Sequence, residues 1–474
     1  MRRGSTKRLR AFAVVRGDET PLYRQICEHI RTAIRTGQLR PGDRVPSTRG
    51  LADQFGTARG TVDAAYAILA GEGYLVGRGP AGTIVSTELD RPVVASVASR
   101  QRLTRRAPSH HVFSPRPFQM GLPALDAFPR KVWSRLVARH ARALAAPDMA
   151  YPDPSGYGPL REAIAGYLAT SRGVSCTAGQ ILITNGYQDA LNLVTDVLLQ
   201  PGDKVWLEDP GYPLVGEALA AAGATLVPIR VDAEGLRVSD GLARARRASF
   251  TVVTPSHQSP LGVALSLPRR LALLSWASAA GAWIIEDDYD SEFRYVGRPL
   301  PALKSLDHEE RVLYAGSFSK VLYPALRLGY LVAPESLVAA FARASRLRHS
   351  GHSTLEQRVV ADFMAAGYFA RHLKRMRTLY GARRQALADN LSAVFGDRIA
   401  VDLKPGGMHL IVRFDRGPRD VELAKLAQAG GLAVEALSRR TMTHAYGQGL
   451  LLGFTNIAEA DALDTCRRLR QVIG

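Results

Sequence analysis

The sequence predicts an α/β protein of two domains, a small helical one followed by a larger one built on a mostly parallel sheet. Residues 19–87 contain three short amphipathic helix patterns and then a glycine-rich hairpin pattern. From residue 119 to 474, continuous apolar runs alternate with helical patterns. This alternation is typical of a parallel sheet with helices on both faces, and the last ~90 residues predict a smaller α/β lobe.

Composition indicates a folded protein with a basic N-terminal region. Hydrophobic residues make up 46% and charged residues 22% of the 474 residues, which excludes wholesale disorder. The net charge is +19, of which residues 1–80 carry +7 and residues 81–118 carry +4. More than half of the excess charge therefore lies in the first quarter of the chain, which indicates a polyanionic partner. A generally basic, solvated surface is the alternative.

The sequence predicts neither a membrane helix nor a signal peptide. The longest apolar run, around residues 271–280, contains Ser275 and Ser278 and is shorter than the ~20 residues that a membrane helix needs. After the basic start of the chain only residues 11–15 are apolar, which is too short for a signal peptide. We therefore expect a cytoplasmic protein with no membrane partner.

The cysteines predict no metal or disulfide chemistry. Cys27, Cys176 and Cys466 lie far apart and form no CxxC pair. We expect three buried thiols and no metal site.

The first domain is expected to contain three helices and a hairpin. Apolar residues recur every four positions from Leu22 to Ile34, which predicts one face of a helix. Ser47 is predicted to cap a second helix that ends at Gly56, and Thr57 is predicted to cap a third. Residues 74–85 then predict two short strands around a glycine-rich turn.

This layout is typical of a winged helix-turn-helix, in which the third helix enters the major groove of double-stranded DNA. Hydroxyl groups and arginines occupy the helix starts and the tip of the hairpin, where phosphates and base edges are contacted. The expected DNA-binding residues are Ser47, Thr48, Arg49, Thr57, Arg59, Thr61 and Arg78. A small helical domain with scattered surface arginines is the alternative.

The remaining segments complete the domain organisation. Residues 1–18 form a basic N-terminal tail, and residues 88–118, rich in Arg, Ser and Pro, are expected to be a linker. In residues 119–474 the predicted strands are ILITN, VWLED, FTVVTP, WIIEDD, VLYAGS and LGYLVA, followed in the smaller lobe by HLIVRF and LLLGF.

Four features of the larger domain suit a phosphate-bearing aldehyde cofactor. Lys320 follows a predicted strand and has hydroxyl neighbours, as a Schiff-base lysine beside a phosphate would. Arg327 can supply a bidentate phosphate contact. The acids at residues 286–288 end another strand, where a carboxylate can keep a pyridine nitrogen protonated. Residues 184–188 lead from a strand into a helix N-terminus, which can hold a phosphate. Each feature alone is more often structural.

Longer stretches carry a family resemblance. Residues 22–86 resemble the GntR-type winged-helix domain, through LRPGDRVPSTRGLA and EGYL, although Gly60 replaces a side chain that is usually polar. Residues 120–474 resemble a PLP-dependent fold-type I aminotransferase-like domain. The matching strings are YPDPSGYGPLREAIAGYL, ILITNGYQDAL, LEDPGYP, TPSHQSPLG, IIEDDYDSEFRY, SFSKVLYPALRLGYLV and KPGGMHL. The whole chain thus resembles the MocR/GabR regulators.

The resemblance implies pyridoxal 5'-phosphate (PLP) as the cofactor and assigns roles to individual residues. Lys320 would form the Schiff base with PLP, Asp287 would pair with the pyridinium, Tyr289 would lie near the ring oxygen and Tyr212 would pack against the ring. The implied phosphate-binding residues are Gly186, Tyr187, Gln188, Ser317, Ser319 and Arg327. Tyr151 matches a tyrosine that reaches a partner subunit's phosphate, which implies a homodimer.

Three departures from the family pattern bear on function. Ser259, with His257 and Gln258 nearby, stands where the enzymes usually place Asn, and Tyr187 stands where a small hydroxyl residue is common. In the late strand, Leu451 occupies the position of the arginine that holds the substrate carboxylate in aminotransferases. Efficient transamination needs that arginine for orientation. Arg413, Arg439 and Arg440 lie in the same lobe and are candidate substitutes.

The sequence therefore predicts a PLP-dependent transcription regulator that binds paired or repeated DNA half-sites as a homodimer. An amine effector such as GABA, taurine or a related amine would be sensed by transaldimination at Lys320, with an aminotransferase-like domain used for sensing and at most residual half-transamination. Activation of an adjacent catabolic or transport operon and repression of its own gene are the modes that the family uses. The alternatives are a regulator of vitamin B6 metabolism that senses PLP itself, an active aminotransferase with a DNA-binding module, and a dimerisation scaffold without cofactor.

Overall fold

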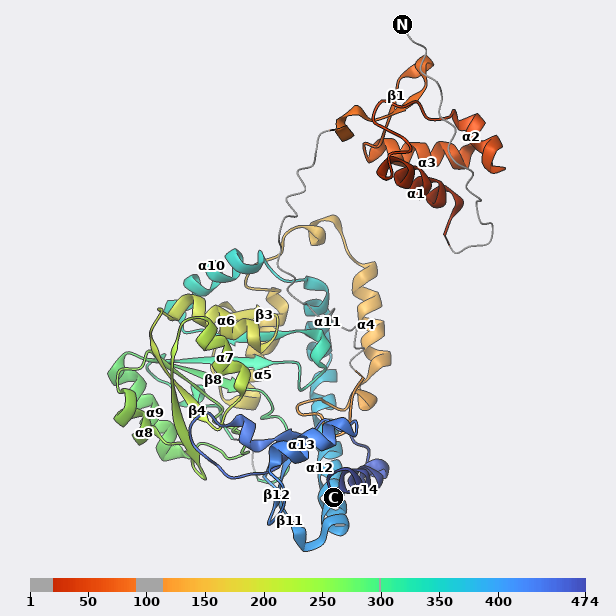
Figure 1. The fold of residues 1–474 in the computed structure, drawn as a ribbon. Helices are drawn as coiled ribbons and strands as arrows, with labels where there is room; N and C mark the ends of the chain where they lie inside the picture. Colours follow the sequence, from red (N-terminus) through yellow and green to blue (C-terminus); the bar gives the residue numbers. More distant parts are fainter. Residues whose placement is uncertain (1–19, 91–113, 298–299) are drawn as a thin grey trace. The chain divides into compact units, whose positions relative to one another are not determined.

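The computed structural model describes residues 20–90, 114–297 and 300–474, and the chain divides into two compact units, residues 1–112 and 113–474. Each unit is considered by itself (Figure 1). The predicted basic tail, residues 1–18, and most of the predicted linker, residues 88–118, lie outside the described residues.

The N-terminal unit has the predicted three helices and hairpin. Its elements are α1 (Leu22–Arg35), α2 (Thr48–Phe55), α3 (Arg59–Gly71), β1 (Leu75–Gly77) and β2 (Thr83–Val85). The two strands pair antiparallel, with Leu75 opposite Val85. The side chain of Ser47 accepts a hydrogen bond from the amide of Gly50, so it caps α2 as predicted, and Gly56 ends that helix in the left-handed conformation.

The start of α3 differs from the prediction by one residue. Ala58, not Thr57, precedes the first residue of the helix, and no side chain caps this end. The amide of Thr57 instead donates to the carbonyl oxygen of Ala52, five residues earlier in α2. Thr57 therefore completes the C-terminal turn of α2, which the left-handed Gly56 makes possible.

Apolar contacts hold the N-terminal unit together. The inward faces of the three helices and the two strands share one core, which includes Ile26, Ile30, Leu51 and Leu69. The hydroxyl of Tyr66 donates to the backbone oxygen of Pro46, which fixes the segment just before α2. This packing leaves the starts of α2 and α3 at the surface.

The larger unit is built on an eight-stranded sheet of order β3-β10-β9-β8-β7-β4-β5-β6. The strands are β3 (Ile181–Thr184), β4 (Lys204–Asp209), β5 (Thr225–Asp232), β6 (Gly235–Leu236), β7 (Phe250–Val253), β8 (Trp283–Asp288), β9 (Val312–Ser317) and β10 (Gly329–Val332). The five central strands from β9 to β5 pair parallel, whereas β10 runs antiparallel to both neighbours. The predicted fold class is confirmed. β5 was not predicted, because Pro228 and Arg230 interrupt its apolar run.

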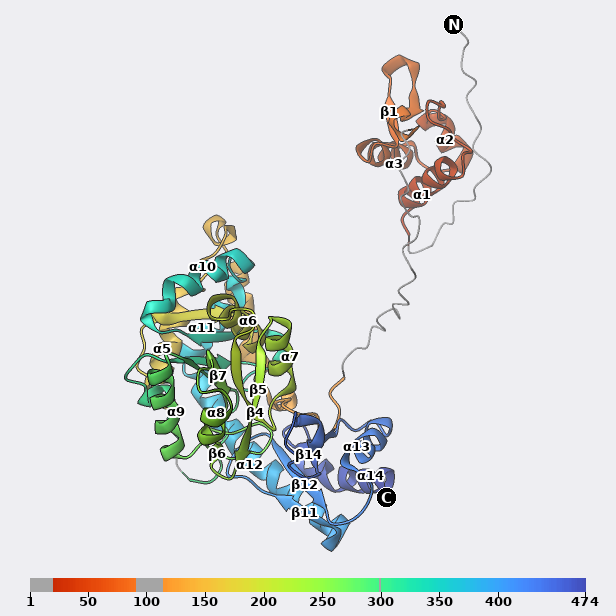
Figure 2. The same ribbon diagram turned by 60° about the vertical axis from the view of Figure 1, so that its left-hand side comes forward.

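Helices cover both faces of this sheet (Figures 1 and 2). One face packs against α6 (Tyr187–Leu198), α7 (Pro213–Ala221) and α10 (Val338–His349). The opposite face packs against α8 (Val238–Ala245) and α9 (Leu267–Ala280), and near β3 and β10 against α5 (Gly158–Arg172), α11 (Thr354–Ala365) and α12 (Tyr368–Phe395). Neighbouring residues of one strand serve opposite faces, as Leu207 and Trp206 do in β4.

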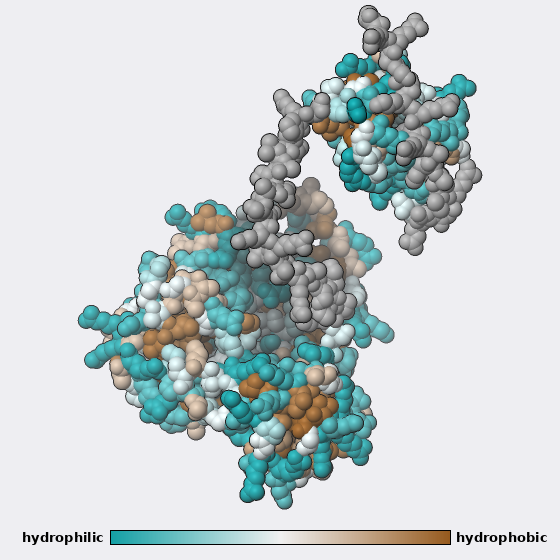
Figure 3. All heavy atoms as spheres, viewed as in Figure 1, coloured by the Kyte–Doolittle hydropathy of each residue, from teal (hydrophilic) through white to brown (hydrophobic). Residues whose placement is uncertain are grey.

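The C-terminal lobe is a separate antiparallel sheet of order β11-β12-β14-β13. Its elements are β11 (Ile399–Asp402), β12 (His409–Phe414), α13 (Asp420–Ala429), β13 (Glu435–Ala436), β14 (Leu450–Gly453) and α14 (Ala462–Ile473), and α4 (Arg130–Arg142) precedes the main sheet. Figure 3 shows apolar side chains gathered over this lobe. The lobe supplies the segment 437–446 to the site described below.

The described residues include no helix that is long and apolar enough to cross a membrane. Cys27 and Cys466 are buried as predicted, Cys176 is half-buried, and all three are free thiols.

Arg172, at the end of α5, is expected to be critical for the stability of the larger unit. Its Nε donates to the buried carboxylate of Asp288 at 2.8 Å, and its other nitrogens bind Leu300 and Ser256. Arg172→Met leaves Asp288 buried without its cation, so we expect the free energy of unfolding to fall by about 3–5 kcal/mol in denaturant titrations of the full chain. Arg467→Met, which removes an exposed ion pair with Asp464, is the control and should change it by less than about 1 kcal/mol.

Candidate functional site

The starts of α2 and α3 and the hairpin tip form the candidate DNA-binding face of the N-terminal unit. Arg49, Arg59 and Arg78 are exposed, and Arg59 lies 3.6 Å from the carboxylate of Asp63 on the same helix. The hydroxyl-bearing residues lie at the same helix starts: Ser47 is exposed, whereas Thr48, Thr57 and Thr61 are half-buried. Because the oxygen of Ser47 already accepts the Gly50 amide, only its hydroxyl hydrogen is available to a phosphate.

The structure adds Arg44 to this face. Arg44 forms a bridge with Ile84 of β2, so the segment before α2 runs beside the hairpin. Its guanidinium lies against Gly82, where an added Cβ would come within 2.8 Å of Nε. Sequence analysis could not identify Arg44, because a single isolated bridge produces no periodic pattern in the sequence.

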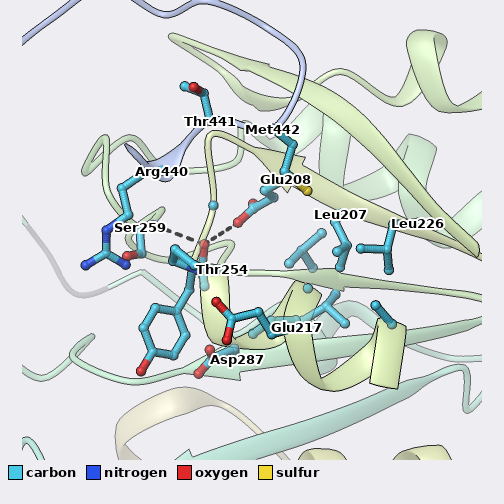
Figure 4. Close-up of a pocket in the computed structure, with 18 of the residues that line it drawn as sticks. Leu207, Glu208, Glu217, Leu226, Thr254, Ser259, Asp287, Arg440, Thr441 and Met442 are labelled. Atoms are coloured by element: carbon cyan, nitrogen blue, oxygen red, sulfur yellow. Dashed lines mark hydrogen bonds between the residues drawn. The ribbon is translucent and has the colours of Figure 1, made fainter. Parts of the chain in front are cut away.

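In the larger unit, a cavity of about 330 Å³ opens at the carboxyl ends of β4, β7 and β8. Its lining residues are Leu207, Glu208, Gly211, Tyr212, Pro213, Val215, Gly216, Glu217, Ala220, Leu226, Val252, Val253, Thr254, Ser259, Asp287, Arg439, Arg440, Thr441 and Met442. Figure 4 shows Asp287 on the sheet side of the cavity and Arg440 on the segment from the C-terminal lobe. Ligands commonly bind at this edge of a parallel sheet.

Asp287 presents a carboxyl group that burial keeps from water. Burial raises its pKa well above the usual range; the nearby hydroxyl of Tyr187 opposes this shift, and the charges of Asp288 and Glu208 add to it. No basic side chain among the described residues forms an ion pair with it. A ring nitrogen that carries a proton could therefore bind this carboxyl group, which has no cationic partner. This fits the pyridinium role expected from the sequence.

The amine of Lys320 is also withdrawn from water. Its Nζ donates to the backbone oxygen of Gly121 at 2.9 Å. Burial lowers its pKa, while the charges of Asp290 and Asp287 oppose that shift. A lowered pKa favours the neutral amine, which is the nucleophilic form. A side chain at Gly121 would displace this amine, because a Cβ there would lie 2.4 Å from Nζ.

The expected phosphate-binding residues gather at the start of α6. Gly186 precedes this helix with φ +81°, and a Cβ on it would lie 3.9 Å from the guanidinium of Arg327. Gly329 lies so close to Gly186 that a Cβ on Gly329 would be 2.9 Å from the Cα of Gly186. Tyr187 and Gln188 occupy the first turn of α6. The helix start and the nearby guanidinium together suit an anion.

The two serines around Lys320 lie in one turn. The amide of Ser319 donates to the hydroxyl oxygen of Ser317 at 3.2 Å, and both side chains are half-buried.

The three expected tyrosines occupy different environments. Tyr212 lines the cavity, and the guanidinium of Arg440 lies over its ring at 5.6 Å. Tyr289 follows β8, and its hydroxyl lies 3.0 Å from Nδ1 of His257. Tyr151 is 92% exposed, and it does not line the cavity of its own chain.

Hydrogen bonds join the β4–α7 loop to the C-terminal lobe beside the cavity. The carboxylate of Asp209 accepts the backbone amides of Met442, Thr443 and His444 at 2.8–2.9 Å. The amide of Gly211 donates to the carbonyl oxygen of Arg440. One wall of the cavity is thereby held to the other.

The position of the missing arginine is filled by an apolar cluster. Leu451 of β14 is fully buried and packs with Ile411, Leu261, Val231 and Leu437. Its environment therefore gives a substrate carboxylate no cation at this strand.

Of the three candidate substitutes, Arg439 and Arg440 line the cavity. Arg413 does not, and it donates instead to the backbone oxygen of Gln448. Arg440 pairs with Glu435 through one nitrogen.

Sequence reasoning misses Glu208 as a cavity residue. Its carboxyl accepts hydrogen bonds from Thr254 and from Gln258, and burial raises its pKa to about 7. Its place at the end of an apolar strand, directly before Asp209, is the signal that could have identified it.

Two protein families match this chain. "Bacterial regulatory proteins, gntR family" matches residues 22–85, and "Aminotransferase class I and II" matches residues 128–444.

Relatives and solved structures agree with both matches. The chain is 38% identical to the probable rhizopine catabolism regulatory protein MocR of Rhizobium meliloti, over 93% of this chain and 92% of that one. It is 34% identical to the pyridoxine biosynthesis transcriptional regulator PdxR of Corynebacterium glutamicum, over 92% of each. Among solved structures, Pyrococcus horikoshii kynurenine aminotransferase has a TM-score of 0.68 and 27% identity, over 76% of this chain and 91% of that one.

The buried carboxyl of Glu208 makes stability depend on pH. Its folded pKa of about 7 exceeds the usual 4.5, so between these values the folded chain keeps a proton that the unfolded chain releases. The stability that Glu208 contributes relative to Glu208→Gln should therefore be full below pH 4.5 and decline as pH rises towards 7, by roughly 1.4 kcal/mol per pH unit. Denaturant unfolding of both proteins at several pH values measures this difference, and a pH-independent difference would contradict the assignment.

Proposed function

We propose an amine-sensing mechanism for this chain, which belongs to the MocR-type family of HTH transcriptional regulators with an aminotransferase-like domain. In this proposal PLP binds at Lys320 and the amine is recognised in the adjoining cavity. The observation that carries it is the half-buried amine of Lys320, which donates to Gly121, has a lowered pKa and feels the charge of the buried carboxyl group of Asp287. When bound, PLP supplies an aldehyde at which an amine effector can replace Lys320.

Residues at the ends of several strands and at the start of α6 would hold the cofactor. Asp287 would accept a hydrogen bond from the ring nitrogen, and Tyr212 would pack against the ring. Tyr289 and Ser259 would lie towards the ring oxygen. The phosphate would bind at the start of α6, through Gly186, Tyr187, Gln188, Ser317, Ser319 and Arg327. This proposal is supported by the closeness of Gly186 to Arg327 and by the acidic end of β8.

The apolar surroundings of Leu451 favour sensing over turnover. An aminotransferase needs a cation that orients the substrate carboxylate for proton transfer, and Leu451 lies in an apolar cluster. Arg440 offers a different cation, on the opposite wall of the cavity from the sheet. We propose that Arg440 attracts the acidic group of an amino-acid-like effector, and that an effector with no acidic group binds more weakly.

The same residue connects recognition to the lobes of the larger unit. Arg440 follows β13 in the C-terminal lobe, whereas Tyr212 and Gly211, which it contacts, belong to the β4–α7 loop. A ligand that binds one arrangement of these two segments better than another shifts the population of the lobes. We propose that this shift changes how the DNA-binding unit meets its DNA.

The proposal includes a homodimer with Tyr151 directed to the partner subunit's phosphate site. The 92% exposure of Tyr151 supports it, because an unburied tyrosine is available to a second chain. We propose that residues 19–87 bind paired or repeated half-sites on double-stranded DNA, and that the protein acts in the cytoplasm on an adjacent catabolic or transport operon and on its own gene.

Two other functions remain candidates. Similarity to the pyridoxine biosynthesis regulator PdxR favours a regulator of vitamin B6 metabolism, for which we propose PLP itself as the signal. Similarity to kynurenine aminotransferase favours an active enzyme, against which the buried Leu451 argues.

Visible absorption of the purified full-length protein tests the proposal. We expect an absorption band from PLP bound to Lys320, its loss in Lys320→Ala, and a change in the band on addition of one amine of a panel, because that amine replaces the lysine. The panel pairs each carboxylate- or sulfonate-bearing amine with its analogue that lacks the acidic group. A band that no amine changes would favour PLP as the signal. Sustained turnover with an oxoacid would favour the enzyme, and no band after added PLP would refute cofactor binding.

The salt dependence of DNA binding tests the DNA-binding face. Arg78 is exposed at the hairpin tip, where a phosphate contact is expected. Arg78→Ala should weaken binding to a mixed-sequence duplex and reduce the slope of log K against log salt concentration by about 1, because one phosphate contact is lost. Arg467→Ala removes an equally charged surface residue from α14 and should leave the slope unchanged. Equal slopes for both variants would place the contact elsewhere.

A further inference from the structure

Three potential metal ligands meet behind the start of α6, outside the cavity described above. Asp189 lies in the first turn of α6, His349 is the last residue of α10, and His352 lies just before α11. Their ligand atoms all lie within 4.8 Å of one another. The Nε2 atom of His349 is 2.6 Å from one carboxylate oxygen of Asp189, and the Nε2 atom of His352 is 3.6 Å from the other.

Burial distinguishes this cluster from exposed polar groups. The side chains of His352 and Asp189 are 6% and 7% exposed, and that of His349 is 22% exposed. The Nε2 atom of His352 is buried without a hydrogen-bond partner, although it points to the carboxylate. A buried imidazole nitrogen that lacks a partner costs free energy, so a ligand that engages it would be stabilising.

We propose that Asp189, His349 and His352 form a binding site for a divalent transition metal ion of the Zn²⁺ class. Two imidazole nitrogens and one carboxylate oxygen are the ligands that Zn²⁺ prefers, and three protein ligands leave a fourth position for water. Tetrahedral Zn–N and Zn–O bonds place neighbouring ligand atoms about 3.4 Å apart. The 3.6 Å separation of His352 from Asp189 matches that spacing, and the His349 contact would open to accept the ion.

The ion would join three segments next to the predicted phosphate-binding turn. Asp189 also accepts the backbone amide of Asn185 at 2.9 Å, and Asn185 directly precedes Gly186. Between the two histidines, Gly351 packs against Pro152, the residue after Tyr151; a Cβ on it would lie 2.6 Å from the Pro152 ring. A bound ion would thus restrain the turn of Gly186 and the segment of Tyr151 together.

Metal binding by the full-length protein, prepared without a polyhistidine tag, tests the site directly. Calorimetric titration with Zn²⁺ should show one site per chain, and Co²⁺ should give the visible absorption of a four-coordinate ion. His352→Gln should weaken Zn²⁺ binding at least about tenfold, since tenfold is the smallest loss typical of even indirect partners of a metal ligand. Because the Nε2 atom of His352 has no hydrogen bond to lose, this variant is expected to fold normally.

A matched control separates this cluster from surface histidines. His308 is exposed and lies outside the cluster, so His308→Gln should bind Zn²⁺ like the unaltered protein. Zn²⁺ should raise the Tm of the unaltered protein and of His308→Gln, and raise that of His352→Gln much less. Equal Zn²⁺ affinity in the two variants, or no saturable Zn²⁺ binding, would overturn the proposal and leave His349 and Asp189 as an ordinary hydrogen-bonded pair. Because these readouts need no PLP or effector, they are independent of the proposed function.

Discussion

The burial of charge at the carboxyl end of β8 is the constraint on which the rest of the larger unit depends. This strand ends in consecutive acids, and alternation sends them to different environments. Asp288 turns to the second face of the sheet, where Arg172 and Tyr314 neutralise and bind it. Asp287 turns to the cavity and has no such cation. One acid therefore stabilises the fold through its cation, while its neighbour faces the cavity without one.

The cavity is formed by two lobes that hydrogen bonds hold together. Asp209, directly after Glu208 in β4, accepts three consecutive amides of the segment that closes the cavity. The neighbouring Arg440 contacts Tyr212 on the opposite wall. A ligand bound between them would change contacts of both lobes at once. This arrangement suits a domain that converts binding into a shift in conformation, provided that the ligand prefers one arrangement.

Leu451 stands where the family pattern places a cation, and its burial in an apolar cluster argues against the chemistry that related enzymes perform. The family pattern includes a lysine, an acid and an anion-binding turn, and Lys320, Asp287 and the turn at Gly186 stand at these positions here, although only Asp287 of the three lines the cavity. Leu451 instead joins Ile411 and Leu261 in a dry cluster. A shared fold therefore supports cofactor binding more strongly than it supports turnover.

The sequence by itself determined most of the elements and their order. Periodicity predicted the three N-terminal helices, the hairpin, the strand that precedes Lys320 and the strand that contains Asp287, because these signals come from residues close together in the chain. It misplaced the cap of α3, where Gly56 alters the local pattern, and it missed β5, which Pro228 interrupts, together with the short strands β6, β11 and β13.

Only the tertiary structure decided which side chains meet across long separations in the chain. The contact of Lys320 with Gly121 spans 199 residues, and that of Asp209 with His444 spans 235. The meeting of His349 and His352 with Asp189 is of the same kind. No local pattern encodes such contacts, because they arise only when the sheet brings the ends of its strands and helices together.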